Sequence, residues 1–147
     1  MKDKIKIPLY LSIASFFLSS MTVWFTSFGV TFAADGNPTL LYILAVSFWL
    51  FFILGFVFLR PISKQRKQDR TFKSKSGIGL FRFFSNKPAI VFDALLIAGA
   101  LALILSFIFP AMPELMITAA TFTMVFSLEM HGVFNGKNYA YLCENKE

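Results

Sequence analysis

Long apolar runs alternate with short polar segments along this chain. Four of the runs are almost free of charge, and each is about as long as the roughly 20 residues that cross a hydrocarbon core of about 30 Å. Backbone groups inside lipid must satisfy one another, and runs of this length do so as helices. The pattern predicts an all-α integral membrane protein, a single membrane domain of four transmembrane helices arranged as two antiparallel hairpins. The expected spans cover about residues 8–34, 39–59, 88–109 and 114–134, with a basic loop over 60–87 and a tail over 135–147.

The start of the chain has an alternative interpretation as a cleaved secretory signal. Lysines precede the first apolar run, and small residues follow it near Ala34. The apolar core of a signal is about 7–15 residues long, however, and this run is far longer. An uncleaved first helix is therefore expected.

The composition agrees with a membrane setting. Of the 147 residues, 56% are hydrophobic, 20 are Phe and only 15% are charged. A soluble domain of this length could not bury so much apolar surface, because small domains bury about two-thirds of the surface of the unfolded chain. The single cysteine, Cys143, excludes an internal disulfide and a cysteine-based zinc cluster.

The distribution of Lys and Arg predicts how the chain is threaded. Basic residues collect on the cytoplasmic side of membrane proteins, and short loops carry this signal. Three lysines precede the first span, and nine basic residues lie within 60–87 beside a single acid, Asp69, whereas the connections over 35–38 and 110–114 have none. Both termini and the basic loop are therefore expected in the cytoplasm of a cell-membrane protein, with two tight turns outside.

The basic loop has two interpretations. It either sets the topology alone, or it also docks on anionic lipid headgroups or an acidic partner, with about 1 kcal/mol contributed per basic residue near a lipid surface. The loop also contains apolar residues that, beside Arg82 and Lys87, suit a short segment lying among the headgroups. They are Ile78, Leu80, Phe81, Phe83 and Phe84. Nucleic acid is not an expected partner, because the basic run adjoins two spans and no binding motif accompanies it. The residues assigned to docking are Lys64, Arg66, Lys67, Arg70, Lys73, Lys75 and Arg82.

Small residues are expected to bring the last two spans together. Close packing and interhelical hydrogen bonds hold helices together in lipid, where apolar burial gives no advantage. If the chain reverses near residue 112, Ala102 lies at the depth of Thr123, and Asp93 lies at the depth of His131. The two stripes are Ala94, Ala98, Ala102 and Ser106 on the third span, and Ala119, Thr123, Ser127, His131 and Asn135 on the fourth.

A candidate polar site lies inside the membrane near the cytoplasmic face. Charged groups at such depth are costly and usually face protein or water. A hydrogen bond between Asp93 and His131 would satisfy both groups, whereas Glu129 points about 200° away from His131 around the helix. It is expected to face the first hairpin, where Ser12 and Ser15 offer hydroxyls. The candidate residues are Asp93, Glu129, His131 and Asn135.

This site also has two interpretations. It is either a set of structural hydrogen bonds, or a proton-titrating or cation-binding site open to the cytoplasm. Past it, Gly136 and Lys137 are typical of a helix exit. Tyr139 and Tyr141 suit the aromatic belt at the membrane surface.

The sequence gives little support for an enzyme. The chain has no Gly-rich phosphate loop and no nucleophile motif, and one histidine with one cysteine does not build an ordinary zinc site. No catalytic residue, cofactor or metal is therefore expected. The leading expectation is a non-enzymatic accessory, regulatory or immunity-type subunit that contacts a membrane-protein partner or a second copy. The alternative is a small homo-oligomeric transporter or channel that uses the polar site.

The segment Phe83–Ala89 leading into Asp93, together with His131 followed by Asn135–Tyr139, resembles small multi-span membrane proteins of Gram-positive bacteria. The resemblance covers about residues 81–142 and does not extend to the first hairpin. It implies a bacterial plasma membrane and implies nothing about mechanism.

Overall fold

The computed structural model describes residues 3–32, 38–69, 72, 81–109 and 111–144. These residues form helices with short connections, and they contain no β-strand. Four of the helices are long and apolar enough to cross a membrane, which confirms the all-α class and a multi-pass membrane protein. The helices are α1 (Asp3–Phe32), α2 (Pro38–Gln68), α3 (Lys87–Ile108), α4 (Glu114–Phe134) and α5 (Lys137–Glu144).

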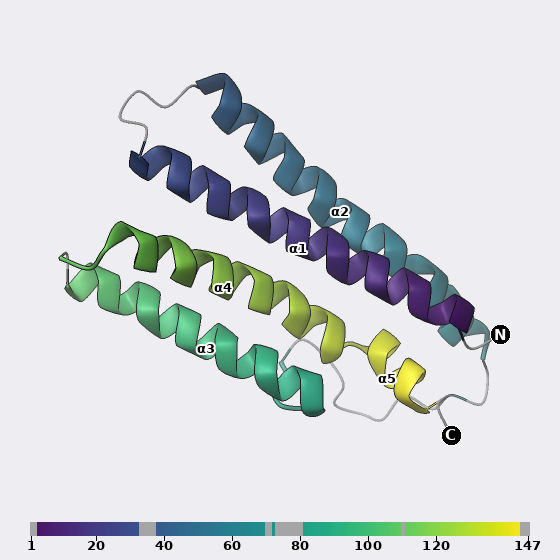
Figure 1. Cartoon of the computed structure of the whole chain (residues 1–147). Coiled ribbons are helices and arrows are strands. Elements are labelled where there is room, and N and C mark those ends of the chain that lie inside the picture. The colour runs from purple at the N-terminus through teal and green to yellow at the C-terminus, as the bar shows by residue number, and fades with distance from the viewer. Residues whose placement is uncertain (1–2, 33–37, 70–71, 73–80, 110, 145–147) are drawn as a thin grey trace.

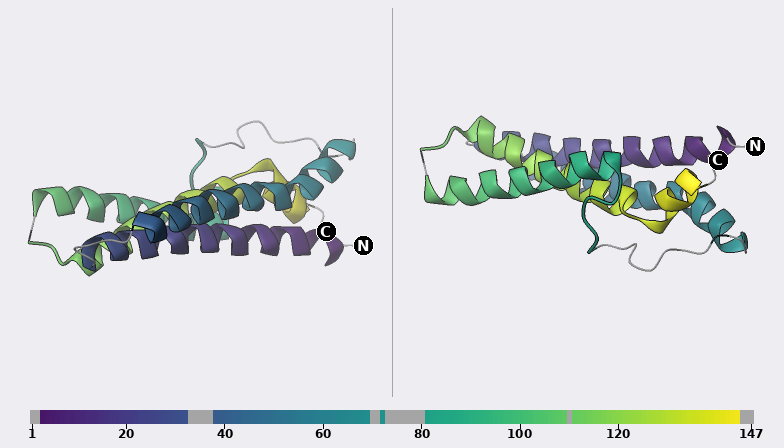
Figure 2. Two further views of the ribbon diagram at one scale, coloured as in Figure 1. Left: turned by 90° about the horizontal axis from the view of Figure 1, so that it is seen from above. Right: turned by 90° about the horizontal axis from the view of Figure 1, so that it is seen from below.

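The four long helices lie in an open row in the order α2, α1, α4, α3 (Figure 1). α1 packs against α2 on one side and against α4 on the other, and α4 packs against α3. Successive helices run in opposite directions, so that the start of α1 and the short helix α5 lie at the same end of the molecule (Figures 1 and 2). No comparable contact joins α2 to α3 in the part of the chain that the structure describes. α1 and α4 therefore hold most of the buried positions, and α2 and α3 expose most of their apolar surface.

The two helix pairs differ in length. α1 and α2 contain 30 and 31 residues, which is about 45 Å of helix, whereas α3 and α4 contain 22 and 21, which is about 32 Å. The excess length of the first pair lies at the end where α1 begins, and α5 lies alongside it, packed on α2 (Figure 1). The sequence predicts a tail over 135–147, and the structure shows that Lys137–Glu144 of this segment form a helix.

α2 continues past the expected end of its span. The sequence predicts a loop from Arg60, but the helix runs through Pro61 to Gln68. Pro61 removes one backbone hydrogen bond. Beyond it, Lys, Gln and Arg are good helix formers, and Arg66 and Lys67 complement the helix dipole in the last turn. The prediction of a loop is thus wrong over 60–68, because the first charges indicate where lipid ends and not where the helix ends.

One aromatic ring fastens α1 to α2. Phe16 of α1 is buried and makes edge-on contacts with Phe52 and Phe56 of α2, at centroid distances of 6.0 and 5.2 Å. The ring fills a notch at Gly55, where an added Cβ would lie 2.5 Å from it. Only a residue without a side chain fits opposite this phenylalanine.

α3 and α4 approach each other most closely at a glycine. A Cβ added to Gly99 would lie 3.0 Å from the backbone nitrogen of Met124 and 3.2 Å from the carbonyl oxygen of Ala120. Backbone atoms cannot move aside as a flexible side chain can. The absence of a side chain at Gly99 therefore allows the two helices to meet.

The small-residue stripe predicted on the third span is wrong. Ala94 and Ala98 are exposed and Ala102 is only half-buried, so that this stripe does not lie between α3 and α4. Asp93 faces α4, and the next residue points about 100° away from it around the helix. On α4 the stripe is partly right, because Ser127 is buried while Thr123 is half-buried.

Candidate functional site

The polar groups at the end of the α3–α4 pair where α3 begins and α4 ends form a buried cluster. The side chains of Asp93 and His131 are almost inaccessible, and Nδ1 of His131 lies 2.6 Å from Oδ1 of Asp93. The amide nitrogen of Asn135 donates to both carboxylate oxygens of Asp93, at 3.2 and 3.3 Å. The pairing of Asp93 with His131 that the sequence predicts is present in the structure, and Asn135 joins it.

Helix periodicity explains how these three residues meet. His131 and Asn135 are one turn apart on the same face of α4. Asp93 lies on the second turn of α3, at the depth expected for a hairpin that reverses near residue 112. An ionised carboxylate only accepts hydrogen bonds, so Nδ1 of His131 is the donor when Asp93 is ionised. The amide nitrogen of Asn135 lies 3.0 Å from the same Nδ1.

The segment before α3 completes the cluster. The hydroxyl of Ser85 donates to Oδ1 of Asn135 at 2.5 Å, and the amide nitrogen of Asn86 donates to the carbonyl oxygen of Phe134 at 2.8 Å. Oδ1 of Asn86 also accepts from the backbone nitrogen of Ala89 and so caps α3. We call Ser85, Asn86, Asp93, His131 and Asn135 the Asp93 cluster.

Two phenylalanines next to Ser85 are also held by this cluster. The backbone nitrogen of Phe84 donates to Oδ2 of Asp93 at 2.5 Å, and Phe84 has a φ of 57°, in the left-handed region that favours glycine. The ring of Phe83 lies against the imidazole of His131, with centroids 4.5 Å apart. The hydrogen bond to a buried carboxylate offsets the backbone strain at Phe84.

Glu129 forms a separate site on the opposite face of α4. It is buried, and Oε2 accepts a hydrogen bond from the hydroxyl of Ser20 in α1 at 2.7 Å. Its second oxygen, Oε1, has no hydrogen-bond partner among the described residues. Glu129 thus faces the first hairpin as predicted, but it bonds to Ser20 and not to Ser12 or Ser15. α1 begins well beyond the end of α4, so the two expected serines lie nearer to the start of α1, at that end of the molecule, than the level of Glu129.

The candidate residues therefore divide into two groups. Asp93, His131 and Asn135 lie together between α3 and α4, whereas Glu129 lies between α4 and α1. No three His, Cys, Asp or Glu side chains within the described ranges are grouped as a metal site requires. What the Asp93 cluster does chemically is to satisfy a buried acid, a base and two amides within the protein.

The basic residues assigned to docking differ in how exposed they are to solvent. Lys64 and Lys67 are exposed on the extension of α2 beyond Arg60, and Arg82 is exposed just before α3. Arg66 is half-buried on the same extension. The remaining three, Arg70, Lys73 and Lys75, lie outside the described residues.

Sequence reasoning missed Ser85 and Asn86 as members of the cluster. The local signal was present, because Asn followed two residues later by Pro is typical of a helix start. That signal predicts the hydrogen bond from the backbone nitrogen of Ala89 to Asn86, but it does not predict the bond from Asn86 to Phe134 at the carboxyl end of α4. The second contact depends on how the two helices dock.

Comparison with protein-family models, with curated proteins and with solved structures finds no match to this chain.

Proposed function

We propose that this protein is a non-enzymatic accessory subunit of the cell membrane, which acts through contacts between its helices and those of a membrane-protein partner. The observation that carries the proposal is the open row of helices. α2 and α3 lie at the two edges of the row, and each packs against one long helix only. Their remaining faces are apolar and free to receive a neighbouring helix.

The engagement of the polar groups supports this proposal. The Asp93 cluster is closed by mutual hydrogen bonds, which is the arrangement expected of a structural element. A buried acid and base that satisfy each other hold two helices in one register. Such a cluster stabilises a scaffold, and it presents no reactive group to a substrate.

The proposal places both ends of the chain and the basic residues in the cytoplasm of a bacterial cell. Lys64 and Lys67 are exposed residues near the end of α2, and this end of α2 lies at the same end of the molecule as the start of α1 and α5 (Figure 1). This clustering of positive charge at one end is the distribution that sets topology in membrane proteins. The choice of a bacterial cell rests on the resemblance that the sequence motifs of residues 81–142 suggest.

Photo-crosslinking in native membranes tests the subunit role. A photoreactive amino acid replaces Ile53 of α2 or Leu101 of α3, both exposed, and Ser19, which is fully buried, serves as the control position. We expect a discrete protein adduct of reproducible mass from at least one exposed position and none from Ser19. If every exposed position on α2 and α3 gives only the uncrosslinked chain, the subunit role is wrong.

One observation favours a second candidate, a homo-oligomeric transporter or channel linked to protons or cations. Glu129 is buried in the membrane with one carboxylate oxygen that no described residue hydrogen bonds. Such acids often mark ion or proton pathways. Ion flux in proteoliposomes separates the two functions. Flux that is lost in a folded Glu129→Gln variant supports transport, and flux equal to that of empty liposomes supports the subunit.

A further inference from the structure

The six residues before α3 and its first residue, Lys87, form a largely exposed surface that the helix-contact function does not use. We call Phe81–Lys87 the aromatic-basic loop. α3 contains 22 residues, about 33 Å of helix, which matches the hydrocarbon thickness of about 30 Å. Lys87 therefore lies at one edge of the lipid core, and the aromatic-basic loop lies in the headgroup region on the cytoplasmic side.

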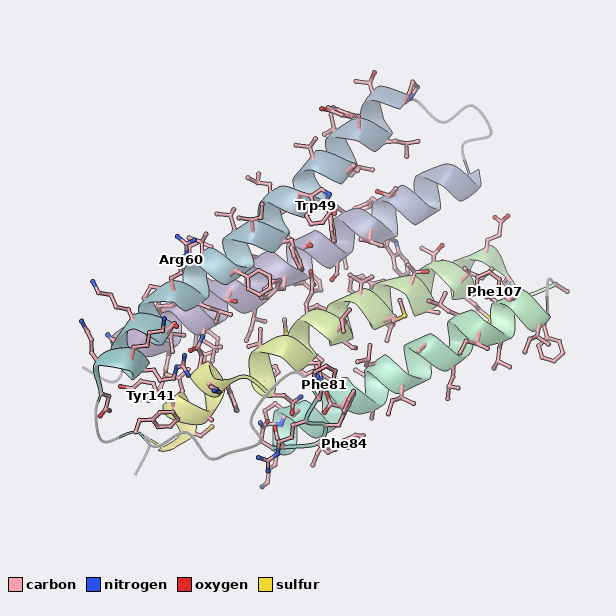
Figure 3. All side chains as sticks on the ribbon, turned by 180° about the vertical axis from the view of Figure 1, so that it is seen from behind. Trp49, Arg60, Phe81, Phe84, Phe107 and Tyr141 are labelled. Carbon is pink, nitrogen blue, oxygen red and sulfur yellow. The ribbon has the colours of Figure 1, made fainter. Side chains whose placement is uncertain are left out.

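The side chains of this loop combine two chemistries. Phe81 is 96% exposed, and Phe83 and Phe84 are 45% and 48% exposed. Figure 3 shows Phe81 and Phe84 beside the first turns of α3, away from α2. Arg82 and Lys87 are also exposed, and the segment contains no acid. Aromatic rings favour the boundary between headgroups and acyl chains, and the two cations there would face lipid phosphates.

The loop is held in place by buried contacts. The backbone nitrogen of Phe84 donates to Asp93, and the hydroxyl of Ser85 donates to Asn135. Asn86 binds the carbonyl oxygen of Phe134. Three successive residues are therefore bonded to α3 and α4, while Phe81, Arg82 and Lys87 on either side of them are exposed. A surface ordered before binding loses less entropy when a ligand arrives.

We propose that the aromatic-basic loop is a binding site for an anionic phospholipid of the cytoplasmic leaflet. Arg82 and Lys87 bind the headgroup phosphate, and the phenylalanine rings occupy the boundary below it. Ser85, Asn135 and Asp93 are positioning residues, which act by holding the loop. A lipid fits better than an acidic protein because three exposed aromatic rings stand at headgroup depth, where a soluble partner would leave them in contact with lipid. This proposal does not depend on the subunit role.

The test measures lipid binding to the full chain in detergent by native mass spectrometry, with phosphatidylglycerol as the anionic probe and phosphatidylcholine as the neutral one. We expect tighter binding of phosphatidylglycerol. The double variant Arg82→Gln, Lys87→Gln should weaken it about 25-fold, at about fivefold for each basic residue near the surface. The matched double variant Lys64→Gln, Lys67→Gln removes the same charge from α2 and should leave the affinity within about twofold of wild type.

Several results would overturn the proposal. Equal weakening by the two double variants would mean that net charge alone attracts the lipid. Equal affinity for the two lipids, or no effect of the Arg82→Gln, Lys87→Gln variant, would remove the site. Displacement of the lipid by millimolar glycerol phosphate would assign the two cations to a soluble phosphate, and preferential binding of polyglutamate would assign them to an acidic protein.

The positioning role has its own test. Ser85→Ala removes one hydrogen bond to Asn135 and should weaken phosphatidylglycerol binding about fivefold, while leaving phosphatidylcholine binding and helix content unchanged. Ser85→Thr keeps the hydroxyl and should restore the affinity for phosphatidylglycerol. If Ser85→Ala weakens the binding of both lipids equally, or if Ser85→Thr does not restore the affinity, Ser85 does not act by positioning the aromatic-basic loop.

Discussion

Asp93 is an acid buried in an apolar helix, and its partners explain how the membrane tolerates it. A buried charge is costly unless it is paired and fully hydrogen bonded. His131, Asn135 and the backbone nitrogen of Phe84 all bond to its carboxylate. The side chains of His131 and Asn135 are themselves buried, so that removing Asp93 takes one hydrogen-bond partner from each of them.

This interdependence predicts a strong coupling between Asp93 and His131. Each of the single variants Asp93→Ala and His131→Ala should lower the free energy of unfolding by about 1–3 kcal/mol, because a buried polar partner is left unsatisfied. The double variant should cost little more than either single one, with a coupling of about 1–3 kcal/mol. Unfolding titrations in detergent micelles measure these values. As a control, Asp93→Ala combined with the distant Ser106→Ala should be additive, and additivity in the Asp93 and His131 pair itself would disprove the pairing.

The helix contact between α3 and α4 predicts a contrast between two neighbouring residues. Gly99→Ala should destabilise the protein by about 1–3 kcal/mol, because the new methyl group would lie 3.0 Å from the backbone nitrogen of Met124. Ala98→Leu adds a larger group on an exposed face and should change the stability by less than about 0.5 kcal/mol. Thermal unfolding of both variants in the same detergent measures the difference. A larger loss of stability in Ala98→Leu than in Gly99→Ala would mean that the alanine stripe is the packing face of α3.

The pairs of residues that the sequence predicted correctly are those set by one tight turn. Asp93 and His131 could be matched in depth because only the turn near residue 112 separates them. The partner of Glu129 was predicted wrongly because its depth relative to α1 depends on how one hairpin docks on the other. Hydropathy carries no information about that docking, and neither Ser12 nor Ser20 stands out from its neighbours in the sequence.

At the scale of elements, the ends of the helices follow local chemistry. The predicted third and fourth spans agree with α3 and α4 within a residue, because Pro88, Pro110 and Pro113 punctuate them. α2 and α5 could not be bounded in this way. Both leave the lipid as helices, and the apolar pattern from which spans are predicted ends where lipid ends.

The junction between α4 and α5 depends on Gly136. A Cβ there would lie 2.7 Å from the carbonyl oxygen of Gly132, whereas a Cβ on Gly132 itself would meet nothing within 4 Å. α5 is seated by Tyr139, whose ring contacts Phe134 edge-on at 4.9 Å. Burial raises the pKa of Tyr139 to about 12, and the neighbouring Cys143 adds to this effect, so that the phenol is neutral at physiological pH.

This geometry predicts that substitution by alanine has an effect at Gly136 and none at Gly132, one turn before it. Gly136→Ala should loosen α5 by about 1–2 kcal/mol and increase the rate at which a maleimide labels Cys143 by about fivefold or more, because the half-buried thiol becomes more accessible. Gly132→Ala should leave the labelling rate unchanged. Equal labelling rates in the two variants would show that α5 does not depend on a close backbone approach at Gly136.

At the scale of the whole molecule, two features set what the protein can do. The open row leaves α2 and α3 with apolar faces toward lipid or a neighbouring helix. The longer first hairpin carries its basic end beyond the lipid, while the shorter second hairpin ends at the aromatic-basic loop. The sequence predicted the number of spans and the basic end, since the order of apolar runs and basic residues along the chain determines both. It did not predict the row or the unequal depths, because these arise from contacts between helices far apart in the chain.

Labelling of single cysteines in intact cells tests the central claim most directly, namely that four spans cross the membrane with the basic end in the cytoplasm. In a Cys143→Ser background, Ala111→Cys places a thiol in the exposed connection between α3 and α4, and Lys64→Cys places one on the extension of α2. A membrane-impermeant maleimide should label the first variant in intact cells and the second only after permeabilisation. Labelling of Lys64→Cys from outside, with Ala111→Cys protected until permeabilisation, would contradict the account.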